Sequence, residues 1–145
     1  MITIIQRVTH ASVTVDDEVI GKIEQGILAL IAVEKMDTPA IAERLLERIL
    51  NYRIFADSHD KMNLSLRDIR GGLLLVPQFT LAANTDKGNR PSFASAAAPD
   101  FGYELFCYLQ KHALQTYETV QFGKFGADMK VALLNDGPVT FTLTV

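Results

Sequence analysis

The chain has 145 residues, of which 48% are hydrophobic, and this size is typical of one domain that buries a core without metals or disulfides. Its formal net charge is −3 at pH 7, which argues against a protein that coats duplex nucleic acid by neutralising phosphates. No apolar run approaches the roughly 18 residues of a membrane span, and the first residues do not resemble a secretory signal. We therefore expect one soluble domain over residues 1–145, without a membrane partner.

The only cysteine, Cys107, lies in a helical pattern and cannot form an internal disulfide. A protein that does not depend on disulfides fits a reducing compartment, and we expect a cytoplasmic protein.

The first third of the chain predicts four strands and one helix. The β-branched residues of 2–8 and the alternation of 11–15 predict two strands, and 19–23 predicts another. The continuous apolar run 27–33 is typical of a buried strand in the middle of a sheet. Asp37-Thr38-Pro39 then predicts a helix start. Its apolar residues recur at helical spacing: Ile41, Leu45, Leu46, Ile49 and Leu50.

The remaining chain predicts a short strand at 52–55, a buried strand at 73–76 that ends at Pro77, and a polar loop between Ala82 and Pro99. A second helix is expected from Pro99 to Thr116. Strands are expected to begin at Val120 and Met129, with a turn at 135–138 and a last strand over 139–145. The predicted fold class is α+β: a mostly antiparallel sheet or barrel-like core packed against two helices.

The common catalytic patterns are missing from this sequence. His10, His59 and His112 lie in different segments without the spacing of metal ligands, so we expect no metal site. There is no G-x-S-x-G elbow for a serine nucleophile, and the glycines form no nucleotide-binding pattern. We therefore expect no cofactor.

Two local clusters remain as candidate sites. Residues 76–81, Val-Pro-Gln-Phe-Thr-Leu, place an amide, an aromatic ring and a hydroxyl where the chain leaves a buried strand. Residues 135–140, Asn-Asp-Gly-Pro-Val-Thr, place a proline at a strand start, where a missing N–H is tolerated. Taken alone, each cluster also fits an ordinary strand end or turn.

Both clusters resemble motifs of the D-aminoacyl-tRNA deacylase family. Residues 77–81 are similar to its Ser-Gln-Phe-Thr-Leu motif, and residues 135–140 to its Asn-x-Gly-Pro-x-Thr motif. The resemblance covers essentially the whole chain. Six further segments are similar to family segments in the same order: 6–8, 33–35, 52–55, 61–64, 90–93 and 125–129.

The resemblance implies a homodimer that hydrolyses the ester of D-aminoacyl-tRNA or glycyl-tRNA at a site on the subunit interface. Gly137 and Pro138, joined by a cis bond, would enter the partner's pocket and exclude L-amino acids with their carbonyls, while Arg7 orients them. A filter made of backbone reads the configuration at Cα, which many substrates share.

The same resemblance makes Gln78, Phe79 and Thr80 the catalytic residues, and it places Pro77 and Met129 in substrate binding. The family usually has serine at position 77, so a mechanism that uses that hydroxyl cannot apply to this chain. Thr80 is then either a nucleophile or a positioning group. The latter is preferred, with help from the substrate's 2′-hydroxyl, because no base neighbours Thr80 in sequence.

Two other functions remain open. One is a non-catalytic RNA-binding or replication-associated module of the same fold, which Pro77 favours. The other is a deacylase for mischarged L-amino acids, although the Gly-Pro pair matches the D-selective pattern. Lys87, Arg90, Lys124 and Lys130 flank the motifs and form either a basic rim for the RNA acceptor end or an ordinary solvated surface.

Overall fold

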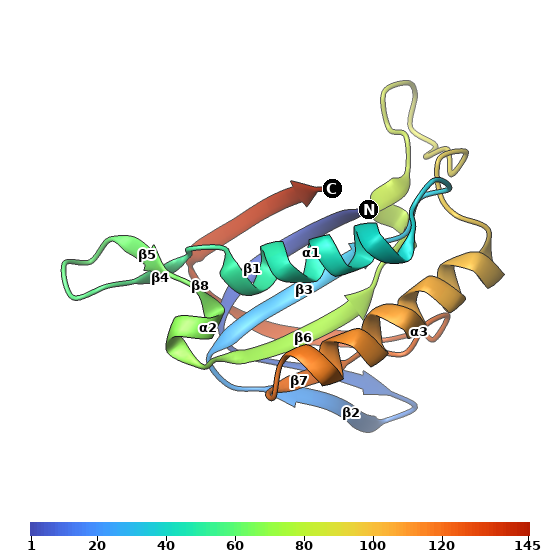
Figure 1. Cartoon of the computed structure of the whole chain (residues 1–145). Coiled ribbons are helices and arrows are strands. Elements are labelled where there is room, and N and C mark those ends of the chain that lie inside the picture. Colours follow the sequence, from blue (N-terminus) through green and yellow to red (C-terminus); the bar gives the residue numbers. More distant parts are fainter.

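A curved, mixed β-sheet forms the framework of the molecule, and the computed structural model describes all 145 residues (Figure 1). The strand order is β2-β1-β3-β6-β7, and β8 pairs with the other edge of β1. A separate hairpin, β4-β5, projects from one end. The strands are β1 (Ile2–Val15), β2 (Glu18–Ile23), β3 (Gly26–Ala32), β4 (Phe55–Ala56), β5 (Met62–Leu64), β6 (Gly72–Pro77), β7 (Val120–Phe122) and β8 (Lys130–Thr144).

The sheet curls because the two halves of β1 pair with different strands. Its first half pairs with β3 and its second half with β2, while β8 pairs with both halves. β2 closes against β7: a Cβ added at Gly21 would lie 2.8 Å from the carbonyl oxygen of Phe122, so only glycine allows this approach. The result is a nearly closed, barrel-like sheet with a small core inside the curl that includes Val13, Leu28 and Leu74.

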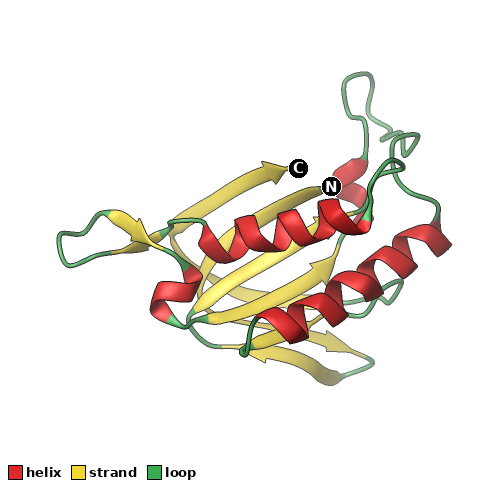
Figure 2. Cartoon of the chain, viewed as in Figure 1, coloured by secondary structure: helices red, strands yellow, loops and turns green.

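Two long helices cover the outer face of the sheet (Figure 2). They are α1 (Pro39–Asn51) and α3 (Pro99–Thr116), and two short helical segments, α2 (Leu66–Ile69) and the 3-10 turn η1 (Phe79–Ala82), connect strands. The larger core lies between the helices and the sheet and includes Leu45, Phe106 and Ile27. None of the helices combines the length and the apolar character needed to cross a membrane.

Several predicted elements are confirmed. β3 lies between β1 and β6 in the middle of the sheet. Helix α1 begins at Pro39, and the Thr38 side chain caps it by accepting a hydrogen bond from the Ile41 N–H at 3.3 Å. Helix α3 has the predicted bounds, and β6 ends at Pro77 as expected.

Other elements differ from the prediction. Residues 2–15 form one strand instead of two, because exposed Thr9 and His10 stay extended along β8, whose register shifts there. The expected break at 135–138 is likewise a bulge within the single long strand β8. The β3-β6 and β6-β7 pairs are parallel. Only Phe55 of the expected 52–55 strand is paired, in the two-residue strand β4. The helix α2 was not predicted, although its Ser65 and Asp68 form a capping box.

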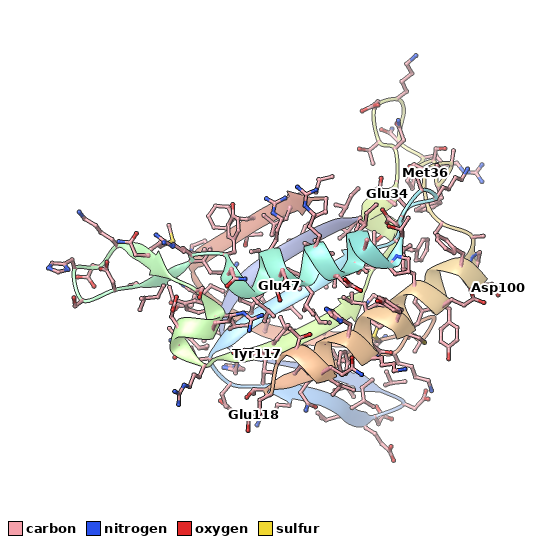
Figure 3. All side chains as sticks on the ribbon, in the orientation of Figure 1. Glu34, Met36, Glu47, Asp100, Tyr117 and Glu118 are labelled. Carbon is pink, nitrogen blue, oxygen red and sulfur yellow. The ribbon has the colours of Figure 1, made fainter.

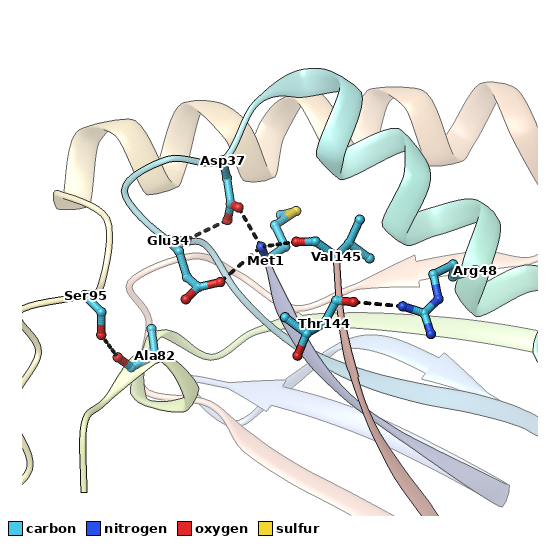
Figure 4. Close-up of polar contacts among 8 residues, drawn as sticks. All are labelled: Met1, Glu34, Asp37, Arg48, Ala82, Ser95, Thr144 and Val145. Atoms are coloured by element: carbon cyan, nitrogen blue, oxygen red, sulfur yellow. Dashed lines mark hydrogen bonds and ion pairs between the residues drawn. The ribbon is translucent and has the colours of Figure 1, made fainter. Parts of the chain in front are cut away.

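The two chain ends meet beside the first turn of α1 (Figure 4). The buried ammonium of Met1 contacts Asp37 Oδ1 at 2.5 Å, Glu34 Oε2 at 3.2 Å and the carbonyl oxygen of Val145 at 3.1 Å. The second oxygen of Asp37 accepts the Glu34 N–H at 2.7 Å. Asp37 therefore ties the start of β1 to the loop before α1.

Candidate active site

The first candidate segment lies where β6 ends and the chain turns into η1. The Gln78 N–H donates to the carbonyl oxygen of Ile31 at 2.7 Å, which extends the pairing of β6 with β3 by one residue. The Gln78 amide Nε2 donates to Thr80 Oγ1 at 2.5 Å, so the two polar side chains of the segment orient each other. Phe79 lies between them with 59% of its surface exposed.

An apolar cavity of about 250 Å³ opens beside this segment, between η1, the first turn of α3 and the loop that follows β7. Its walls are mostly apolar, which suits an apolar or aromatic ligand with few polar anchors. The lining residues are Ile31, Val33, Pro77, Phe79, Ala97, Pro99, Gly102, Phe106, Phe125 and Gly126.

Met129 borders the same site, because its side chain and that of Pro77 both lie next to Gly123. A Cβ built at Gly123 would come within 2.8 Å of Met129 Sδ and 3.2 Å of Pro77 Cδ, so both side chains border this glycine. The Lys124 N–H donates to Met129 Sδ at 3.3 Å and fixes the thioether. The structure therefore brings Pro77, Gln78, Phe79, Thr80 and Met129 into one region.

The second candidate segment is a bulge of β8 opposite Arg7. Gln6 pairs with Thr140 and Val8 with Asn135, so residues 136–139 of β8 face Arg7 alone. Gly137 and Pro138 are exposed at the top of this bulge, and their peptide bond is cis, as predicted. Gly137 has φ +132°, a conformation that L side chains rarely adopt.

Arg7 holds the bulge from below. Its Nε donates to the carbonyl oxygen of Asp136 at 3.0 Å and lies 3.3 Å from the carboxylate of the same residue. Its Nη1 donates to the carbonyl oxygen of Ile54 at 2.7 Å. The guanidinium thereby connects the bulge to the chain entering β4.

The outer residues of the motif close the bulge. Asn135 Oδ1 accepts the Val139 N–H at 3.0 Å, and Asn135 Nδ2 donates to Thr140 Oγ1 at 2.9 Å. The spacing Asn-x-Gly-Pro-x-Thr thus has a local cause, because its first and last residues bond across the Gly-Pro pair.

The two candidate segments lie far apart within one chain. Arg7 pairs with Ile27 at the start of β3, whereas Pro77 pairs with Ile31 near its end. Four residues of strand correspond to roughly 13 Å. Gly137 and Pro138 are absent from the cavity lining, so a single chain does not unite the predicted filter with the predicted pocket.

The structure adds aromatic residues that sequence reasoning did not assign to the site. The ring of Phe93 lies 5.2 Å from that of Phe79, and Tyr103 packs edge-on against Phe125 at 5.8 Å. The neighbouring Cys107 raises the pKa of Tyr103. Phe93 and Phe125 both lie in segments that resemble the family, which is the signal that could have placed them.

Comparisons with known proteins identify the family of the chain. The family model described as D-Tyr-tRNA(Tyr) deacylase matches residues 4–144. The chain belongs to this deacylase family. A D-aminoacyl-tRNA deacylase of Pseudomonas fluorescens (strain Pf0-1) is 59% identical over 140 residues, which are 97% of each chain. A D-aminoacyl-tRNA deacylase of Nitrosococcus oceani is 56% identical and covers 100% of this chain and 94% of its own. These relatives are hydrolases that act on ester bonds.

Solved structures share the deacylase-family fold seen here. The structure titled "c-Myc DNA Unwinding Element Binding Protein" has a TM-score of 0.95 and 38% identity, covering 100% of this chain and 99% of that one. A structure described as a probable eukaryotic D-amino acid tRNA deacylase has a TM-score of 0.85 at 18% identity, with coverage of 98% and 97%. The second likeness concerns the fold alone.

Proposed function

We propose that this chain hydrolyses the ester bond between a D-amino acid, or glycine, and the terminal ribose of tRNA. The observation that carries the proposal is the presence, in a deacylase-family chain, of both an apolar pocket edged by Gln78-Phe79-Thr80 and a braced, exposed Gly137–Pro138 bulge. The pocket provides room for the acylated nucleoside. The bulge provides a backbone surface that distinguishes configurations at Cα.

The separation of pocket and bulge supports a homodimer with a shared site. Each chain offers an exposed Gly-Pro pair that does not line the apolar cavity, and the cavity has no such backbone pair in its own wall. In a two-fold dimer, each subunit's bulge enters the pocket of the other, so each bulge gains a pocket and each pocket gains a wall of backbone.

The filter acts by steric exclusion. Gly137 has no side chain, so its carbonyl and that of Pro138 approach the substrate Cα closely. An L side chain would point into this backbone, whereas a D side chain would point away and the hydrogen of glycine would fit either way. Discrimination thus comes from excluding the L enantiomer, and it does not depend on which side chain the amino acid carries.

Hydrolysis relies on the substrate as well as on the protein. No histidine or carboxylate contacts Thr80, and its Oγ1 already accepts the amide of Gln78, so Thr80 positions a ligand and is not the nucleophile. The 2′-hydroxyl next to the ester assists the attack of water. Pro77 has no N–H, so donors to the developing oxyanion come from the backbone after it.

The decisive measurement compares hydrolysis of D-Tyr-tRNA, L-Tyr-tRNA and Gly-tRNA by the purified protein. We expect release of tyrosine from the D-ester and of glycine, with the L-ester stable. Preferential cleavage of L-Tyr-tRNA would contradict the filter, and the absence of turnover with all three would contradict the enzyme assignment.

A subunit-mixing experiment tests the shared site. Ala97→Phe blocks the pocket and Gly137→Ala damages the bulge, so each homodimer should be inactive. A heterodimer would carry both defects in one site and neither in the other. Random reassociation of equal amounts should therefore restore about a quarter of the wild-type rate, because half of the dimers have one intact site of two. No recovery in verified heterodimers would show that pocket and bulge act within one chain.

A second candidate is a non-catalytic nucleic-acid-binding role. It is favoured by the 38% identity to the c-Myc DNA unwinding element binding protein structure and by proline at position 77. Such a protein would bind nucleic acid with strong salt dependence and without turnover, so the assay above separates the two roles.

A further inference from the structure

The loop that joins η1 to α3 forms a hairpin that projects from the body of the molecule (Figure 1). Asn84 and Ser92 pair across its base, with N–H to carbonyl distances of 2.7 and 3.0 Å. The chain on both sides of the hairpin lines the cavity, through Phe79 before it and Ala97 after it. Its position is therefore fixed relative to any ligand bound there.

The tip of this hairpin is cationic in a chain with a net charge of −3. Lys87 and Arg90 are both exposed, and neither makes an ion pair or a side-chain hydrogen bond. The one acid of the segment, Asp86, accepts a hydrogen bond from Asn84 Nδ2 at the base.

The remaining hairpin turns are acidic by contrast. The turn between β1 and β2 is Asp16-Asp17, and the turn between β4 and β5 contains Asp57 and Asp60. Glu34 lies beside the base of the projecting loop (Figure 3), where its backbone forms an isolated β-bridge with Ala96. Its carboxylate is already paired with the Met1 ammonium. Unpaired positive charge is thus presented on the hairpin that borders the cavity.

We propose that Lys87 and Arg90 bind backbone phosphates of the tRNA acceptor arm upstream of the acylated nucleotide, so that the hairpin docks RNA outside the pocket. Lys87 follows Asn84 by three residues and Arg90 precedes Ser92 by two, so both lie on the loop beyond the paired base. Neither residue lines the cavity, so the cations are placed to meet the polynucleotide that leads into it and not the ester. Two such contacts bind the RNA locally and do not require the extended basic surface of proteins that coat duplex nucleic acid.

This inference rests on the proposed function, and its test separates the two. We would measure the binding of an uncharged acceptor-stem minihelix and of the trinucleotide CCA by fluorescence anisotropy, beside kcat and KM for D-Tyr-tRNA. The variant is Lys87→Gln/Arg90→Gln. The matched control is Arg44→Gln/Lys111→Gln, which removes one arginine and one lysine that are exposed and unpaired on α1 and α3.

The hairpin variant should weaken minihelix binding about tenfold at low salt, raise KM for D-Tyr-tRNA similarly and leave kcat unchanged. Its slope of log K against log salt should be smaller by about 1.4–1.8, which corresponds to two lost phosphate contacts. Binding of CCA should not change, and the control should behave as wild type.

The proposal is overturned if the control variant weakens minihelix binding as much as the hairpin variant, since only net charge would then matter. It is equally overturned if CCA binding falls in parallel or if minihelix binding is unaffected. Failure of wild type to hydrolyse D-Tyr-tRNA would instead contradict the proposed function, while the binding data would still decide the role of the hairpin.

Discussion

The Nε of Arg7 lies 3.0 Å from the carbonyl oxygen of Asp136, so a half-buried strand residue holds the peptide that directly precedes Gly137. The same guanidinium donates to Ile54, and only 15% of the side chain is exposed. The orientation of the exposed Gly-Pro pair is therefore set from beneath by a planar group with two fixed donor directions.

Arg7→Lys should weaken stereoselectivity while preserving the fold. Lysine keeps the charge, but its single ammonium cannot reproduce the forked contacts to Asp136 and Ile54. We expect the ratio of kcat/KM for D-Tyr-tRNA to that for L-Tyr-tRNA to fall at least about tenfold, which corresponds to about 1.4 kcal/mol. Arg44→Lys, at an exposed residue without an ion pair, should leave the ratio unchanged. An unaltered ratio in Arg7→Lys would remove Arg7 from the positioning role.

Gly137→Ala should distort the bulge itself. The added Cβ would lie 2.6 Å from Val139 Cγ2 and 3.1 Å from Arg7 Nη2, at a φ of +132°. We expect more than a tenfold loss of kcat/KM for D-Tyr-tRNA, measured beside the D/L ratio. Gly88→Ala is the control for the D/L ratio, because Gly88 also has a positive φ, +70°, but has no neighbouring atom within 4 Å. An equal change of the D/L ratio in both variants would mean that backbone conformation alone, and not the site, explains the effect.

Thr80→Ala should lower kcat only about threefold, because the Thr80 hydroxyl positions Gln78 and ligand without forming a covalent bond. A D-Tyr-tRNA that ends in 2′-deoxyadenosine should react at least about a hundredfold more slowly with the wild-type protein. Single-turnover kinetics on both substrates would check the two effects separately. A dead Thr80→Ala enzyme together with normal turnover of the deoxy substrate would instead support Thr80 as the nucleophile.

Asp37→Asn should destabilise the chain without touching the site. Asp37 is 7% exposed and neutralises the buried Met1 ammonium, so its removal leaves a buried charge poorly compensated. Breaking such a pair typically costs about 3 kcal/mol, or about 10 °C in Tm for a domain of this size. Glu34→Gln should cost clearly less, since the Glu34 side chain is 31% exposed. Thermal unfolding followed by circular dichroism would compare the two, and equal Tm values would contradict the assignment.

Much of the fold could be predicted from local patterns. The apolar run of β3 indicated a central strand, and Thr38-Pro39 indicated the start of α1. Both features depend on residues that are neighbours in the sequence, so a local pattern predicts them. Strand pairing has no such local pattern. The parallel partners of β6 and the continuity of β8 through Pro138 depend on contacts between residues distant in the chain, and periodicity does not report them.

The candidate site likewise divides into features that local sequence patterns predicted and features that depend on distant contacts. The residues of the two motifs were predicted, and the structure supplies the reason for one spacing, because Asn135 and Thr140 bond across the Gly-Pro pair. The sequence could not show that the motifs lie at opposite ends of β3. The cavity walls from α3 and from the loop after β7 were also unassigned, since Phe106 looks like any other core residue of a helix.

The hydrocarbon lining of the cavity has a consequence for acid–base behaviour. None of its ten residues has a side chain that ionises, and the adjoining Gln78 and Thr80 are neutral as well. The partner subunit's Gly137 and the partner subunit's Pro138 would add no ionisable side chain. A bell-shaped pH–rate profile requires an acid or a base that titrates in the site. The pH–rate profile should therefore show no inflection between about pH 6 and 8 that comes from a titrating side chain of the cavity.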